Sequence, residues 1–76
     1  MRTIEEFAEI LKTMYEDAPK KEQVVNIHLF GIEYGEEIIK AKFSASKIIN
    51  TSGLKKSYIT ELSKGVKLSK FVTLKK

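Results

Sequence analysis

Hydrophobic side chains recur every three to four positions over residues 4–17, and this spacing predicts an amphipathic helix. Its apolar positions are Ile4, Phe7, Ala8, Leu11, Met14 and Tyr15. Thr3 and Glu6 fit a capping box, in which a hydroxyl and a carboxylate each satisfy a backbone N–H at the helix start. Pro19 ends the helix, because the residue before a proline avoids the helical conformation. We expect the apolar stripe of this helix to face the core.

Residues 20–43 fit two structures. A helix would place seven positions on one stripe: Val24, Ile27, His28, Gly31, Tyr34, Gly35 and Ile38. Gly31 and Gly35, one turn apart, would then let a neighbouring helix approach closely, although each glycine costs a helix about 1 kcal/mol. In the alternative, a hairpin, the same glycines bracket a turn between two strands. We favour the helix, because Glu36 and Lys40 then form a favourable i,i+4 pair.

Residues 44–64 predict two short helices joined by a turn. Ser44 is suited to cap the first helix, over about residues 45–51. Gly53 can adopt the positive φ that closes this helix, and the second helix spans residues 55–64. The inward-facing positions are Ile48, Ile49, Ile59 and Leu62. Two short helices joined by a glycine-containing turn form the helix-turn-helix pattern.

Charge divides the chain into two halves. Residues 1–43 carry six basic and nine acidic side chains, a net charge of −3, whereas residues 44–76 carry eight lysines and one glutamate, a net charge of +7. Such an asymmetry indicates an anionic partner for the basic half, nucleic acid or a membrane surface. The alternative is a lysine-rich solvated face that only confers solubility.

Composition excludes several classes of protein. No apolar run approaches the roughly 18 residues of a membrane span, and the N-terminal residues have no signal-peptide character. The chain has no cysteine and therefore no disulfide framework or thiolate zinc site. We expect a single globular domain over residues 1–76, located in the cytoplasm with the nucleoid.

Residues 44–62 resemble the helix-turn-helix of bacterial and phage winged-helix and related DNA-binding proteins. The positions that match the family pattern are Ile48, Gly53, Leu54, Ser57, Ile59 and Leu62. Two positions depart from it: Ile49 stands where the family usually has alanine, and Ser52 where an apolar residue is common. The resemblance covers about 20 of the 76 residues and implies binding to double-stranded DNA.

In this motif the second helix enters the major groove, and its N-terminal residues meet base edges. The predicted DNA-binding residues are Ser44, Ser46, Lys47, Lys55, Lys56, Ser57, Tyr58, Thr60, Glu61 and Lys64. The lysines among them suit phosphates, and the two serines before Lys47 suit a phosphate contact through backbone amides. Ser57, Thr60 and Glu61 can read bases, since a glutamate accepts from cytosine N4. For Tyr58, the sequence is equally consistent with packing in the core and with contacting a phosphate.

The tail after Gly65, which is expected to stop the second helix, alternates apolar and lysine positions. Phe71, Val72 and Leu74 favour a short strand or a last turn packed on the core, where a rudimentary wing would begin. Lysines that would flank the DNA there are Lys67, Lys70, Lys75 and Lys76. The predicted fold is therefore mainly α, a compact three- to four-helix domain with a short C-terminal strand or rudimentary wing.

The residues for catalysis are missing. Gly31 and Gly35 lack the following Lys-Ser/Thr of a phosphate-binding loop. His28, on an apolar face, is expected to be a hydrogen-bonded core histidine. Glu36 and Glu37 resemble a catalytic acid pair only superficially, because adjacent residues on a helix point about 100° apart. We expect no enzymatic activity, no metal and no cofactor.

These observations favour a DNA-binding protein, either a transcriptional regulator or the DNA-reading module of a larger mobile-element, phage or restriction system. Because so small a domain makes few base contacts, we expect it to form a homodimer or to bind a protein partner. The expected contact surface is the helix over residues 4–17. The alternative is a protein-interaction module that turns its basic face to an acidic partner. RNA binding is disfavoured, because no exposed aromatic pair suited to base stacking is evident.

Overall fold

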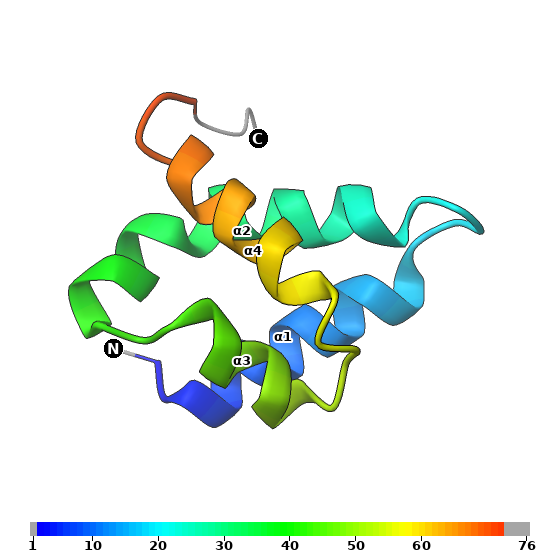
Figure 1. The fold of residues 1–76 in the computed structure, drawn as a ribbon, viewed down its shortest axis with the longest axis horizontal. Helices are drawn as coiled ribbons and strands as arrows, with labels where there is room; N and C mark the ends of the chain where they lie inside the picture. The colour runs from blue at the N-terminus through cyan, green and yellow to red at the C-terminus, as the bar shows by residue number, and fades with distance from the viewer. Residues whose placement is uncertain (1, 73–76) are drawn as a thin grey trace.

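In a computed structural model, which describes residues 2–72, the chain forms four helices (Figure 1). They are α1 (Ile4–Asp17), α2 (Gln23–Ala41), α3 (Ala45–Ser52) and α4 (Tyr58–Leu68). The expected mainly α fold is confirmed. The helix over residues 20–43 is confirmed as well, and the hairpin alternative is wrong.

Side-chain caps fix the starts of α1 and α3. The Oγ1 of Thr3 accepts the backbone N–H of Glu6 at 3.1 Å, and the Glu6 carboxylate accepts the backbone N–H of Thr3 at 2.8 Å. Ser44 Oγ accepts the backbone N–H of Lys47 at 3.0 Å. The predicted capping box and the predicted N-cap are therefore both present, because they depend on residues only three positions apart.

The capping box gives a testable stability effect. Hydrogen bonding of the Glu6 carboxyl to the backbone of Thr3, and secondly to its side chain, lowers the pKa of this carboxyl. The charged form therefore supports the fold above the ordinary glutamate pKa, and this support is lost as the pH falls through the lowered value. We expect Thr3→Ala to lower the free energy of unfolding at pH 7 by about 1 kcal/mol. We also expect the variant to lose less stability than the wild type on acidification, which urea unfolding at pH 7 and pH 3 would measure.

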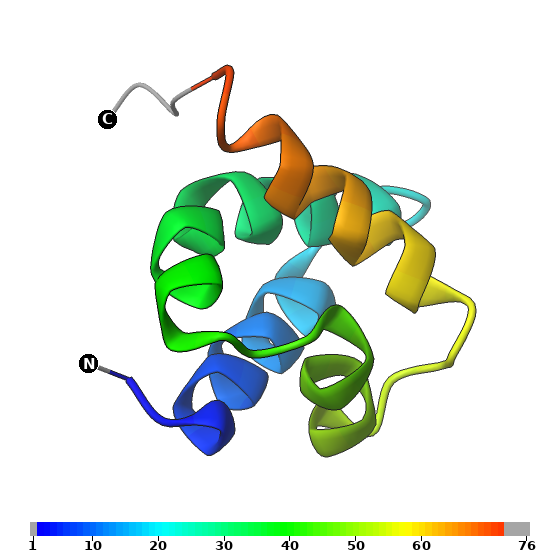
Figure 2. The ribbon, with the colours of Figure 1, turned by 60° about the vertical axis from the view of Figure 1, so that its left-hand side comes forward.

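The four helices pack in a closed ring, in which α1 contacts α2 and α3, and α4 also contacts α2 and α3. Figure 2 shows this arrangement, with α3 and α4 on one side and α1 and α2 on the other. The enclosed core contains Phe7, Leu11, Ile27, Phe30, Ile38, Ile48, Ile49 and Leu62. The aromatic ring of Phe7 stands edge-on to those of Phe30, Tyr34 and Phe43, with centroid distances of 6.5, 6.2 and 5.9 Å. The helical periodicities of the sequence identified most core-facing positions, but the stripe predicted for residues 20–43 missed the buried Phe30 and included the exposed Val24.

Helices α2 and α4 meet backbone to backbone, as Gly31 and Gly35 predicted. A Cβ on Gly31 would lie 2.7 Å from the carbonyl carbon of Gly65 and 2.8 Å from its Cα. A Cβ on Gly65 would lie 2.7 Å from the carbonyl oxygen of His28. The prediction that Gly65 stops the second helix is wrong: it lies inside α4, where its missing side chain permits the crossing.

The connection between α3 and α4 differs from the sequence prediction. Gly53 has φ +79° and ends α3 as expected, but α4 begins at Tyr58, three residues later than the predicted start at residue 55. Residues 55–57 instead form turns, in which the backbone N–H of Tyr58 donates to the carbonyl of Lys55 at 3.0 Å. The extra residues carry the chain from the end of α3 to the start of α4.

Ser52 shows how a polar residue occupies a position that is commonly apolar in helix-turn-helix proteins. Its side chain is buried. Its hydroxyl donates to the carbonyl of Ile49 at 2.7 Å and accepts the backbone N–H of Leu54 at 3.3 Å. The turn after α3 therefore satisfies the hydroxyl within the domain, which removes the usual penalty for burying it.

The expected strand or wing does not form in the described residues. Helix α4 continues to Leu68, and residues 69–71 make a turn. Phe71 is 82% exposed and Val72 is 46% exposed, so the prediction that they pack on the core is wrong. Leu74, Lys75 and Lys76 lie outside the described residues.

Candidate nucleic-acid interface

The outward side of α4 is the centre of the candidate interface. Thr60, Lys64 and Lys67 are exposed and are spaced i, i+4 and i+7, so they share one side of the helix. Leu62 and Gly65 on the opposite side are buried. Lys67 was predicted only as a tail lysine that would flank the DNA, because the second helix was expected to stop at Gly65; the structure places it in α4.

The turn before α4 adds two more cations. Lys55, Lys56 and Ser57 are all exposed. Ser57 occupies the N-cap position of α4, yet its side chain makes no capping hydrogen bond there. This hydroxyl and the two ammonium groups therefore face solvent at the amino-terminal end of α4, the end that meets bases in the helix-turn-helix motif.

Tyr58 packs against the domain and is partly buried, which agrees with the core-packing alternative. Its ring lies 5.4 Å from that of Tyr15, centroid to centroid, and the two hydroxyls are 3.2 Å apart. The hydrogen bond with Tyr58 raises the pKa of the Tyr15 hydroxyl. The pair ties the end of α1 to the start of α4 and thereby helps to fix the direction of α4.

Glu61 makes its hydrogen bond within the domain. Its Oε1 lies 2.8 Å from Nε2 of His28 on α2 and 3.8 Å from Nζ of Lys64. His28 is hydrogen-bonded, as expected, but it is not a core residue, because its side chain remains 32% exposed. The carboxylate that the sequence assigned to cytosine recognition is therefore directed towards α2.

The start of α3 lies beside the carboxyl-terminal half of α4. A hollow of about 210 Å³ is lined by Ala45 of α3, by Ser63, Val66 and Lys67 of α4, and by Ile38, Ile39 and Phe43 from the end of α2 and the segment after it. The neighbouring residues Ser46 and Lys47 are exposed, as is Ser44, whose hydroxyl caps α3. The two helices thus present polar side chains from adjacent segments.

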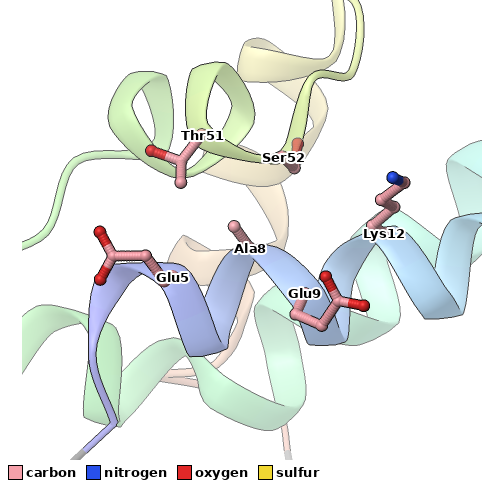
Figure 3. A pocket seen from close by; sticks show the side chains of 6 residues that line it. All are labelled: Glu5, Ala8, Glu9, Lys12, Thr51 and Ser52. Carbon is pink, nitrogen blue, oxygen red and sulfur yellow. The ribbon is translucent and has the colours of Figure 1, made fainter.

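A second hollow, also of about 210 Å³, lies between α1 and α3 (Figure 3). It is lined by Glu5, Ala8, Glu9, Lys12, Thr51 and Ser52. Its two carboxylates are unsuited to an anionic ligand. Nothing in this lining pairs a nucleophile with a base in the way that covalent catalysis requires.

The described residues offer little for metal binding or membrane insertion. No three His, Asp or Glu side chains between residues 2 and 72 come together as a metal-binding group. None of the four helices in this part of the chain combines the length and the apolar character needed to cross a bilayer.

A short capped helix, a glycine-closed turn and a second helix with a polar outer side define a helix-turn-helix type of domain. The chain belongs to the HTH-like domain family, whose model matches residues 3–75. This membership points to DNA as the general class of partner. The chain matches no curated protein and no solved structure.

Proposed function

We propose that this protein binds double-stranded DNA by placing α4 in the major groove, as a transcriptional regulator or as the DNA-reading module of a larger system. The observation that carries the proposal is the polar outer side of α4, where Thr60, Lys64 and Lys67 are exposed while the inner side is held in the core. This role would place the protein in the cytoplasm with the nucleoid.

The dimensions of α4 suit the groove. Its 11 residues span roughly 16 Å at about 1.5 Å per residue. A helix with its side chains is about 10–12 Å in diameter, and the major groove of B-DNA is about 12 Å wide. The diameter of α4 is therefore compatible with insertion into the groove.

The exposed groups divide into two roles in this proposal. Ser57 and Thr60 carry hydroxyls that both donate and accept hydrogen bonds, and we assign them to base edges. The lysines are assigned to phosphates, which give affinity and register without sequence information; they are Lys47, Lys55, Lys56, Lys64 and Lys67. Ser44 and Ser46 are assigned to a further phosphate at the start of α3.

A second copy or a protein partner would complete the DNA contact. One helix offers only a few base-reading groups, whereas helix-turn-helix proteins commonly read two half-sites as dimers. The exposed edge of α1 beside α3, which presents Glu5 and Glu9 to solvent, is the surface we assign to that contact. It carries the opposite charge to the proposed DNA-binding surface.

The salt dependence of binding tests the proposal. Each phosphate contact contributes about 0.9 to the slope of log K against log salt, so the five assigned lysines give a slope of about −4.5. The affinity for a mixed-sequence duplex should then fall about 500-fold between 50 and 200 mM salt. Fluorescence anisotropy would measure this, and no binding at 50 mM salt to any of several mixed duplexes would refute the proposal.

The second candidate function is a protein-interaction module that uses the same basic surface on an acidic partner. The observation that favours it is the internal bond of Glu61, which leaves lysines as the main charged groups on α4. Lysines supply charge without base specificity. Under this alternative, reversing the charge of Lys55 and Lys56 would leave DNA retention unchanged and would release a co-purifying protein.

A further inference from the structure

The glycine crossing brings His28 to Glu61. His28 lies three residues before Gly31 on α2, and Glu61 lies four residues before Gly65 on α4, so each is one turn from the crossing point. Nε2 of His28 and Oε1 of Glu61 are 2.8 Å apart. An ionised carboxylate only accepts hydrogen bonds, so Nε2 of His28 carries the proton and donates it.

The same carboxylate oxygen of Glu61 has a second possible partner, the ammonium group of Lys64. It lies 3.8 Å from Nζ of Lys64, one turn further along α4. Lys64 belongs to the outer side of the helix, and its side chain is 60% exposed. The shorter contact is to His28, whose ring approaches from α2, so Glu61 is drawn towards the domain rather than towards the outer side.

We propose that His28 is a positioning residue for DNA binding: it holds the carboxylate of Glu61 against α2 and leaves the ammonium of Lys64 available to a phosphate. The inference rests on the proposed function and goes beyond it, because His28 itself touches no DNA in this arrangement. It also changes the role of Glu61, which is restrained by His28 and does not read cytosine.

Loss of the His28 donor has a defined electrostatic consequence. Without it, Glu61 keeps one cationic neighbour, Lys64, at the i,i+3 spacing that favours an ion pair on a helix. Closing that pair would neutralise Lys64 and would bring a negative charge to the outer side of α4. Both changes oppose contact with a phosphate.

The first experiment removes the donor. We expect His28→Ala to weaken binding to a mixed-sequence DNA duplex about eightfold at 0.1 M salt and to make the salt slope shallower by about 0.9, the effect of one lost phosphate contact. His28→Leu, which keeps more of the packing and also lacks a donor, should behave in the same way. His28→Gln should bind like the wild type, because its amide nitrogen can still donate to Glu61.

A second substitution that restores DNA binding would distinguish a positioning role of His28 from a merely structural one. Adding Glu61→Gln to His28→Ala removes the charge that would neutralise Lys64, so the wild-type salt slope should return. Glu33→Gln in the same background is the charge-matched control. Glu33 is on α2 and lines a surface hollow with Glu36, Glu37 and Lys40 only, so its neutralisation should not restore the slope.

The outcomes distinguish this inference from the proposed function. A wild-type slope in folded His28→Ala and His28→Leu would overturn the inference, and so would an equal rescue by Glu33→Gln. Weak binding by Glu61→Gln alone would also overturn it, because that result would return Glu61 to base reading. If the wild-type protein fails to bind DNA, or if Lys64→Gln leaves the salt slope unchanged, the proposed DNA-binding surface itself is wrong.

Discussion

Replacing Gly31 or Gly65 with alanine is expected to destabilise the domain by about 2–3 kcal/mol. The new Cβ would lie within 2.7–2.8 Å of backbone atoms of the facing helix, and backbone cannot move aside by changing rotamer. Alanine is intrinsically better than glycine in a helix by about 1 kcal/mol, so helix propensity alone predicts the opposite sign. We expect the steric cost to exceed this gain, because the added Cβ would meet backbone atoms of the facing helix.

The loss would be a large part of the total stability. A domain of this length has a free energy of unfolding of roughly 4–11 kcal/mol, at about 0.05–0.15 kcal/mol per residue. Urea unfolding followed by circular dichroism would measure the change. Gly53→Ala is the control, because nothing lies within 4 Å of its Cβ position and only the left-handed backbone opposes it, by about 1 kcal/mol. Wild-type stability in both the Gly31 and the Gly65 variants would contradict the crossing described above.

Reversing two charges before α4, with Lys55→Glu and Lys56→Glu together, is expected to weaken DNA binding at least about 100-fold at 0.1 M salt. Each lost phosphate contact accounts for about an eightfold loss at this concentration, and the two new carboxylates repel the backbone as well. Both residues are exposed and lie outside the helices, so the fold should be unaffected. Anisotropy titration at several salt concentrations would also show a slope shallower by about 1.8 or more.

The chain provides a matched control in another adjacent lysine pair. Lys20 and Lys21 lie in the turn between α1 and α2 and are exposed. Reversing them changes the net charge by the same amount on a different part of the molecule. DNA affinity should fall far less than in the Lys55 and Lys56 variant. Equal losses in the two variants would mean that net charge, and not the surface around α4, determines binding.

Features that depend on nearby residues could be predicted from the sequence. The caps at Thr3 and Ser44 need only a partner three residues away, and Gly53 ends α3 because of its own backbone freedom. The buried positions follow from helical periodicity, which Phe7 and Leu11 illustrate. These signals gave the order of the helices and their inner sides.

Features that depend on distant residues could not be predicted in this way. Glycine commonly ends helices, so the sequence alone predicts a helix stop at Gly65. Only the proximity of Gly31 and His28 on α2 shows why α4 continues through it. The bond between His28 and Glu61 joins residues 33 positions apart on helices whose crossing has no local signal. The sequence therefore indicated the basic surface but not which of its charged groups are engaged inside the domain.

The backbone contact between α2 and α4 also bears on how the nascent chain acquires its fold during synthesis. Residues 2–52 contain three helices, but the glycine side of α2 remains uncovered until α4 has left the ribosome. At Gly31 the facing group is the backbone of Gly65, so this contact forms only when α4 packs on α2. The proposed DNA-binding surface would therefore be complete only when α4 has docked on α2 and closed the ring.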